Sequence, residues 1–168
     1  GWTYDDLQGK VEEVAAALVA CEVGKGSRVG VLTTNRLEFF AAFFGAGTAG
    51  AIACPLSTFS TPAELEILLQ QSAVSVLILE RRVLTKDFVD ILLELEPAIG
   101  STAPGRLSST RFPFLRHIVM VDDEPGFGAV EGWAQFRARG AGVARELIEA
   151  RADQVTPADP GTLFFSSG

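Results

Sequence analysis

The sequence predicts an α/β fold: a largely parallel sheet with flanking helices on both of its faces. Five short apolar runs are separated mostly by helical patterns, which is typical of βαβ units. These runs lack an alternation of apolar and polar residues, as expected for strands that helices cover on both sides. The chain has 168 residues, 48% of them hydrophobic, so one domain-sized unit with a buried core is expected.

Start signals predict three of the helices. Thr3 stands as an N-cap before an acidic first turn. Asn35 and Glu38 are spaced as a capping box for the second helix. The segment Thr61–Glu64 combines a threonine cap, an early proline and a glutamate at capping-box spacing. Apolar residues at helical spacing predict further helices over 84–95, 133–139 and 144–150.

The predicted strands cover residues 28–32, 51–54, 74–79, 117–121 and 162–165. In an open parallel sheet, ligands bind just past the carboxyl ends of the strands. Candidate sites are therefore expected in the segments that follow them, which are Thr33–Asn35, Leu56–Thr58, Glu80–Arg81, Asp122–Glu124 and Ser166–Gly168.

Charge and cysteine content narrow the possible partners and location. The net charge of −7 and the pI near 4.7 argue against binding nucleic acid through a basic surface. Cys21 and Cys54 form no CxxC pair and are expected to be buried thiols in a reducing, cytoplasmic environment. Residues 1–10 are polar and acidic, so they do not have the pattern of a signal peptide.

An uncharged run raises the possibility of a membrane span. Phe39–Leu56 is 18 residues long and almost free of polar groups, which is the length of a spanning helix. However, three glycines and Pro55 interrupt it, and no cluster of Lys or Arg flanks it. We expect a buried helix followed by a buried strand, and no membrane span.

Two local motifs have a functional and a structural interpretation. Gly45–Gly50 matches G-x-G-x-x-G, so one alternative is a dinucleotide-binding module. That motif must follow a strand and open a helix, whereas these glycines follow a helix and precede a strand. This placement favours a helix C-terminus whose small residues allow close packing of the helix against the sheet. Asp122–Glu124 could bind a divalent cation, but a solvated acidic turn is the better interpretation, and no metal site is predicted.

The run Thr162–Phe165 ends in Ser166, Ser167 and Gly168. A strand that passes into a Ser/Gly loop presents backbone N–H groups and hydroxyls at the carboxyl edge of the sheet. Such groups bind phosphate. A plain turn remains the alternative on the residues alone.

Five segments in the same order resemble motifs of the adenylate-forming (AMP-binding) superfamily, most closely its acyl-CoA synthetases. Trp2–Leu7 is similar to T-Y-x-[DE]-L, and Val23–Val29 to G-V-x-K-G-D-R-V with Val-Gly and Ser as departures. Asn35–Phe39 resembles N-x-x-E-F, and Ala49–Leu56 resembles A-G-A-x-x-x-P-L. Leu163–Gly168 resembles the first half of the ATP phosphate loop, which continues [ST]-[ST]-G-x-P-K-G.

The resemblance implies a fold, an activity and a small part of a site. Residues 1–168 would be the N-terminal portion of a synthetase domain, truncated inside the phosphate loop. The full-length parent would use ATP, Mg²⁺ and CoA to convert a carboxylic acid, fatty or aryl, into its CoA thioester. Segments 56–60 and 84–88 favour acyl- or aryl-acid ligases over amino-acid-activating domains. Only Ser166, Ser167 and Gly168 carry over, as nucleotide-binding residues.

The resemblance also limits what this chain can do. The family's acyl pocket, Mg²⁺-binding segment, ribose-binding aspartate and catalytic lysine match no residue here, so no catalytic residue is predicted. We expect the 168-residue chain to be inactive alone and to hold no cofactor. It is expected to self-associate through uncovered apolar surface. The alternatives are a non-catalytic interaction scaffold and the dinucleotide module at Gly45–Gly50.

Overall fold

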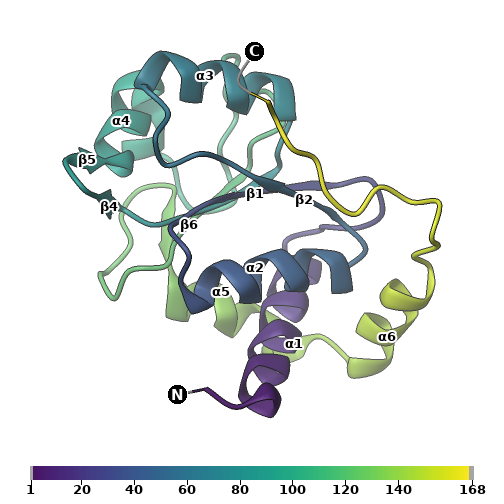
Figure 1. The fold of residues 1–168 in the computed structure, drawn as a ribbon. Coiled ribbons are helices and arrows are strands. Elements are labelled where there is room, and N and C mark those ends of the chain that lie inside the picture. The colour runs from purple at the N-terminus through teal and green to yellow at the C-terminus, as the bar shows by residue number, and fades with distance from the viewer. Residues whose placement is uncertain (1, 167–168) are drawn as a thin grey trace.

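A computed structural model of the chain describes residues 2–166. Its centre is a five-stranded sheet in the order β2-β1-β3-β6-β7, in which every paired strand is parallel (Figure 1). The strands are β1 (Arg28–Leu32), β2 (Ile52–Pro55), β3 (Val76–Leu79), β6 (His117–Met120) and β7 (Val130–Gly132). The predicted α/β class and parallel sheet are confirmed.

Helices cover both faces of the sheet (Figure 1). One face carries α1 (Tyr4–Ala20), α2 (Leu37–Thr48) and α5 (Trp133–Ala138), with η2 (Arg139–Gly142) and α6 (Arg145–Asp153) beside them. The other face carries α3 (Pro62–Ser72), α4 (Phe88–Leu95) and η1 (Pro97–Gly100). A small antiparallel hairpin, β4 (Arg82–Val83) and β5 (Lys86–Asp87), precedes α4.

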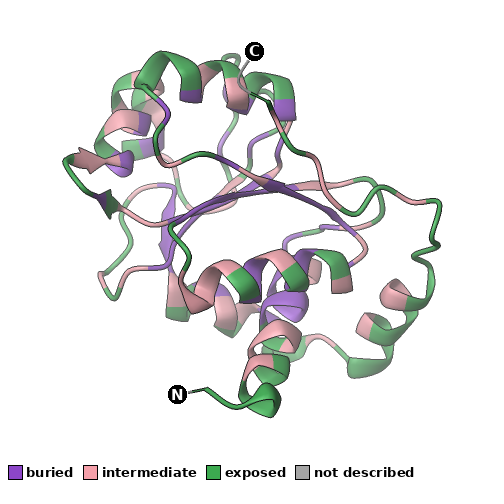
Figure 2. Ribbon diagram, in the orientation of Figure 1, coloured by how far each residue is buried: buried purple, intermediate pink, exposed green. Residues whose placement is uncertain are grey.

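The sheet separates two apolar cores, and its central strands are buried along their length (Figure 2). The core under α3 and α4 contains Phe88, Phe112 and Leu77, and the core under α1 and α2 contains Leu18 and Phe136. Burial of both strand faces explains why the strands are continuous apolar runs in the sequence.

The predicted helix starts are confirmed at two positions and wrong at one. Thr3 and Thr61 each form a complete capping box. The Asn35–Glu38 box does not form, because α2 has Arg36 at its N-cap and no side-chain cap. Glu38 instead accepts a hydrogen bond from Arg36 Nε at 2.7 Å. A hydrogen bond between two charged groups is stronger than one to a neutral backbone N–H, which favours this arrangement.

The fifth strand of the sheet is β7, not the terminal run 162–165. The sequence did not predict β7, because its central residue is Glu131 and a carboxylate is unexpected in a buried strand. In the structure, Arg139 Nε donates to both carboxylate oxygens of Glu131, at 2.7 and 3.0 Å. The terminal run makes one parallel bridge, Thr162 to Ala53 on the outer edge of β2. The ladder stops there because the next outward-facing residue, Pro55, has no N–H to donate.

The hairpin also shortens a predicted helix. The helix expected over 84–95 begins only at Phe88. Leu84 lies in the turn of the β4–β5 hairpin with a φ of 54°, in the left-handed region, so it cannot start a helix.

The uncharged run Phe39–Leu56 and the glycine motif within it both have a structural role in packing. Phe39–Leu56 forms α2 and β2, and no helix within residues 2–166 is long and apolar enough to cross a bilayer. Gly45 lies in the last part of α2 against α1, where a Cβ atom would be 2.8 Å from Val14 Cγ1. The motif Gly45–Gly50 therefore begins within the last turn of α2, and Gly45 lets α2 approach α1 closely. A packing role was expected, but the partner at Gly45 is a helix and not the sheet.

Candidate functional site

The strand order reverses between β1 and β3, which is the usual ligand position in such a sheet. Here a carboxylate of the protein itself bridges the ends of β1 and β3. Glu80 Oε2, after β3, accepts hydrogen bonds from Thr34 N at 2.9 Å and Thr34 Oγ1 at 2.7 Å, after β1. Arg36 Nη1 lies 3.4 Å from Glu80 Oε1. Two predicted strand-end segments thus meet, but they satisfy each other.

The acidic segment after β6 is bound by arginines. Asp122 Oδ2 accepts a hydrogen bond from the backbone N–H of Arg81 at 2.6 Å. The Arg81 guanidinium pairs with Glu124 and Asp87, each at 2.9 Å. A hydrogen bond from Arg82 contributes most to lowering the pKa of Glu124. Within residues 2–166, no cluster of three or more His, Cys, Asp or Glu is placed to hold a metal ion.

A groove of about 530 Å³ lies beside that segment, between the start of α2 and α5. Trp133 and Arg137 of α5 line it together with Arg36. The Arg137 guanidinium lies 5.9 Å from the Trp133 ring centroid, and its Nη1 donates to Glu13 Oε2 at 3.0 Å. The sequence predicted a helix over 133–139, which α5 confirms, but it indicated no functional residue within that helix.

A second groove of about 530 Å³ adjoins the end of the described chain. Its lining includes Leu56 and Phe59 from the β2–α3 connection, Ile67 from α3, and Phe165 and Ser166 from the terminal run. We call it the Ser166 groove. It brings together two of the predicted segments, 56–58 and 166, because the terminal run lies parallel to β2 and both end at the same edge.

Ser166 is exposed at the margin of this groove. Ser167 and Gly168, the other predicted nucleotide-binding residues, lie outside the described residues. The groove wall is mainly apolar, with a few hydroxyl, amide and carboxylate groups, which is the usual composition of a small-molecule site.

Neither cysteine is placed for nucleophilic chemistry. Burial raises the pKa of Cys54 to about 11 and that of Cys21 to about 12. Both thiols are therefore protonated at neutral pH, and the expectation that they are buried is confirmed.

The parallel α/β sheet agrees with the fold that the resemblance to adenylate-forming enzymes implies. The chain belongs to the AMP-binding enzyme family, which matches residues 1–168.

Curated relatives are CoA ligases. The chain is 31% identical over 171 residues to 4-coumarate–CoA ligase 2 of Oryza sativa subsp. japonica. It is 29% identical over 168 residues to the acyl-CoA ligase SID4 of Ajellomyces capsulatus. Each match covers 99% of this chain and 27% of the relative, so the chain spans about a quarter of the length of these ligases.

Solved structures show the same fold. Coronafacic acid ligase from Pectobacterium brasiliense superposes with a TM-score of 0.73 at 17% identity, covering 98% of this chain and 28% of the ligase. The apo structure of Mycobacterium smegmatis MbtA superposes with a TM-score of 0.69 at 24% identity, covering 99% and 26%.

Proposed function

We propose that this chain is the N-terminal part of an ATP-dependent acid–thiol ligase of the acyl-CoA synthetase type, acting in the cytoplasm. In the first half-reaction, a carboxylate oxygen attacks the α-phosphorus of ATP, giving an acyl-adenylate and pyrophosphate. In the second, the thiol of CoA attacks the acyl carbon, giving the thioester and AMP. The observation that carries this proposal is the family match along the whole chain, with CoA ligases as curated relatives.

Within this scheme, Ser166 is the described residue that we assign to nucleotide binding, with Ser167 and Gly168 following it. Its position supports the assignment, because it is exposed at the margin of an apolar groove at the sheet edge. A hydroxyl and successive backbone N–H groups there would donate to the phosphate oxygens of ATP. The family implies Mg²⁺, but no described cluster of carboxylates fits it, so we assign no step to a metal in this chain.

We propose that the 168-residue chain alone is inactive, because no catalytic residue of the family maps onto it. The test is ATP–pyrophosphate exchange driven by a panel of fatty and aryl acids. We expect exchange from the full-length parent and none from this chain. Exchange by the isolated chain would contradict the inactivity, and failure of the parent with every acid would favour a non-catalytic scaffold.

A dinucleotide module at Gly45–Gly50 has a poor structural basis, because the glycines lie at the carboxyl end of α2, not at a helix start. Titration of the chain with NAD or FAD would detect it as saturable micromolar binding, which we do not expect.

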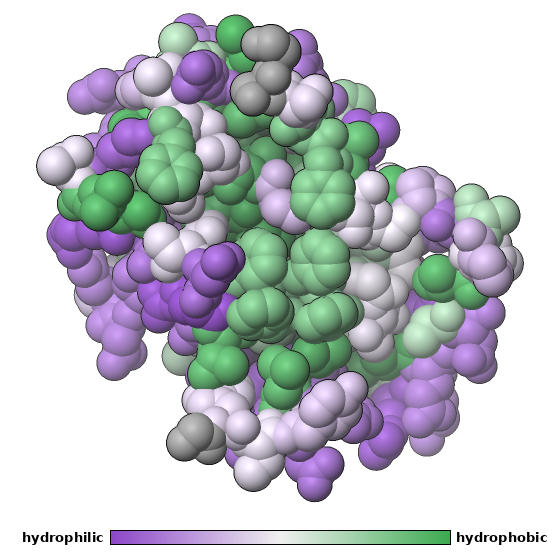
Figure 3. All heavy atoms as spheres, viewed as in Figure 1, coloured by the Kyte–Doolittle hydropathy of each residue, from purple (hydrophilic) through white to green (hydrophobic). Residues whose placement is uncertain are grey.

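We also propose that the isolated chain associates with a second copy. Apolar side chains gather in the middle of the face that carries α2 and β2 (Figure 3). Phe44 of α2 is 49% exposed and Phe164 of the terminal run 73% exposed. Light scattering should show a concentration-dependent dimer that Phe44→Glu weakens, and a monomer at all concentrations would refute the proposal.

A further inference from the structure

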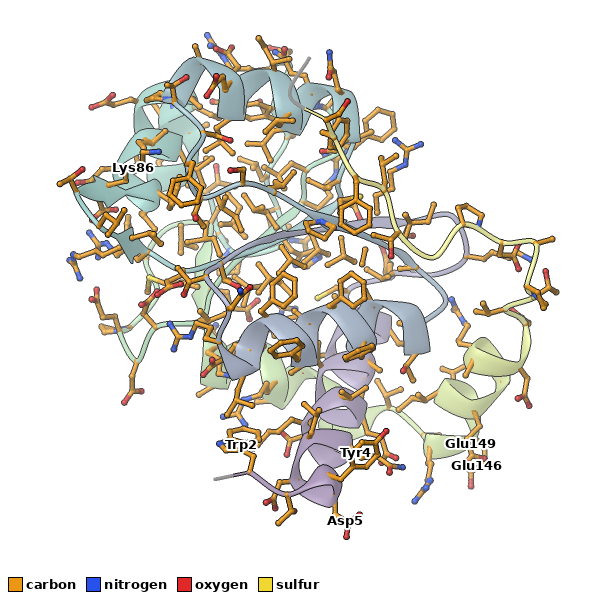
Figure 4. The ribbon with its side chains drawn as sticks, in the orientation of Figure 1. Trp2, Tyr4, Asp5, Lys86, Glu146 and Glu149 are labelled. Carbon is orange, nitrogen blue, oxygen red and sulfur yellow. The ribbon has the colours of Figure 1, made fainter. Side chains whose placement is uncertain are left out.

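The hairpin β4–β5 reaches back to the connection between β2 and α3. Figure 4 shows Lys86 on this hairpin, at the side of the layer formed by α3 and α4. Its ammonium group donates to the carbonyl oxygen of Ser60 at 2.8 Å and to that of Thr58 at 3.1 Å. Two carbonyls that are 26 and 28 residues earlier in the chain thus converge on one cation.

The acceptor is a tight turn with bonds of its own. Ser60 N donates to the carbonyl oxygen of Ser57 at 3.2 Å, and Phe59 N donates to Ser57 Oγ at 3.2 Å. Ser60 is buried, whereas the Phe59 ring is 78% exposed. We call residues 57–60 the Ser57 turn. It leads directly to the Thr61 cap of α3.

Lys86 differs from the chain's paired surface lysines. Lys25 pairs with Asp159 at 3.2 Å, and Lys10 with Glu13 at 3.5 Å. Among residues 2–166, Lys86 has no carboxylate partner within ion-pair distance, and its ammonium group donates instead to backbone carbonyls of the Ser57 turn. Within the same residues, those two carbonyls have no other hydrogen-bond donor. Removing the ammonium group would therefore free this side of the turn.

The Ser57 turn is also part of the Ser166 groove. Ser57, Phe59 and Ser60 line it together with Phe165 and Ser166. Leu56 and Leu65, which flank the turn, belong to the buried cluster against which Phe165 packs. A displacement of the turn therefore changes the surface on which the terminal run and Ser166 rest.

We propose that Lys86 is a positioning residue that fixes the Ser57 turn and, through it, the groove that supports Ser166. This inference deepens the proposed function, and only its consequence for the ligase rests on that function. In the ligase, release of the turn would hold Ser166 less firmly for the phosphates, so ATP binding would weaken. Lys86 touches no reacting group in this role.

The first experiment measures residue-resolved amide hydrogen exchange of the 168-residue chain. In Lys86→Met, which keeps an unbranched side chain of similar length, we expect the Ser60 amide to exchange at least tenfold faster, with the amides of β1 and β3 unchanged. Lys86→Arg restores a donor and should return the rate to within threefold of the original. Lys25→Met, which removes a different surface lysine, should leave the Ser60 amide unchanged.

Equal Ser60 exchange in Lys86→Met and the original chain would overturn the proposal. So would uniform acceleration of all amides, which marks general destabilisation. If Lys86→Met does not fold, the Lys86→Arg protein provides the test. A folded Lys86→Arg protein whose Ser60 amide exchanges without protection would also contradict the proposal, because arginine supplies a donor in place of the ammonium group.

The second experiment measures pyrophosphate exchange in the full-length ligase. We expect Lys86→Met to raise the KM for ATP about three- to tenfold, with kcat and the KM for the carboxylic acid within twofold of the original. An unchanged KM for ATP would refute the connection from the turn to Ser166. Absence of exchange in the unmodified ligase would refute the proposed function, while the hydrogen-exchange result would still decide whether Lys86 fixes the turn.

Discussion

Gly45 offers a direct test of whether its motif serves helix packing. In Gly45→Ala, the new Cβ would lie 2.8 Å from Val14 Cγ1 and 3.3 Å from the backbone nitrogen of Ala15. Alanine within a helix gains about 0.5–1 kcal/mol over glycine, while overpacking costs about 1–3 kcal/mol. The overpacking cost is expected to win, because the backbone of α1 cannot move aside as a flexible side chain could. We expect a net loss of about 0.5–2 kcal/mol.

Gly47→Ala is the matched control, because Gly47 lies in the same helix and a Cβ there meets nothing within 4 Å. It should gain about 0.5–1 kcal/mol from helix propensity alone. For a chain of this size, 1 kcal/mol corresponds to about 2–4 °C in Tm. Thermal unfolding should thus lower Tm by about 1–8 °C in Gly45→Ala and raise it by about 1–4 °C in Gly47→Ala.

A double variant isolates the contact itself. Val14→Ala removes the Cγ1 atom nearest to the new methyl group, so it should reduce the cost of Gly45→Ala, a coupling that the double-mutant cycle measures. If Gly45→Ala were as stable as Gly47→Ala, close packing would not be the reason for glycine at this position.

Three further results are expected. Cys21 and Cys54, with pKa values raised by burial to about 12 and about 11, should not react with a disulfide reagent at pH 8 until the chain is unfolded; rapid native labelling would contradict their burial. Burial lowers the pKa of His117 from its usual value of 6.5, and the charge of a nearby arginine lowers it further. The unfolded state therefore binds more protons than the folded state, and the free energy of unfolding should fall as the pH drops below about 6.5. His117→Gln should flatten that slope in denaturant titrations at pH 7 and 5.5, and an unchanged slope would assign it to other groups. Glu80→Ala removes the acceptor of two Thr34 hydrogen bonds and should lower the free energy of unfolding in urea by about 1–2 kcal/mol. Hydrogen bonds to a charged group are worth about 1.5–3 kcal/mol, and water replaces part of them. An unchanged free energy of unfolding would mean that water replaces them fully.

Several elements could be predicted because their signals are local. The Thr61 cap, the proline after it and Glu64 act within one helical turn, and the structure forms that capping box as predicted. The Asn35–Glu38 box failed because Arg36, between them, takes the carboxylate, and a spacing pattern does not weigh such competition. β7 was missed because the partner of its buried glutamate, Arg139, lies on a separate element, η2.

The candidate site shows the same division. The sequence predicted which segments follow the strands, and the structure places the described ones at the carboxyl edge of the sheet. The sequence could not predict that Glu80 would bridge the ends of β1 and β3, because that contact depends on two loops 46 residues apart meeting in space. Nor could it predict the Lys86 contacts with the Ser57 turn, which require the hairpin that replaced part of an expected helix.

By itself, the sequence determined the α/β class, the parallel sheet and the resemblance to adenylate-forming enzymes, because hydrophobic periodicity, capping residues and motif order are all carried by neighbouring positions. Only the tertiary structure decided the strand order, the use of Gly45 for helix contact and the joining of segment 56–58 to Ser166 in one groove. These depend on which surfaces meet once the strands align, and contacts between distant segments leave no local pattern in a single sequence.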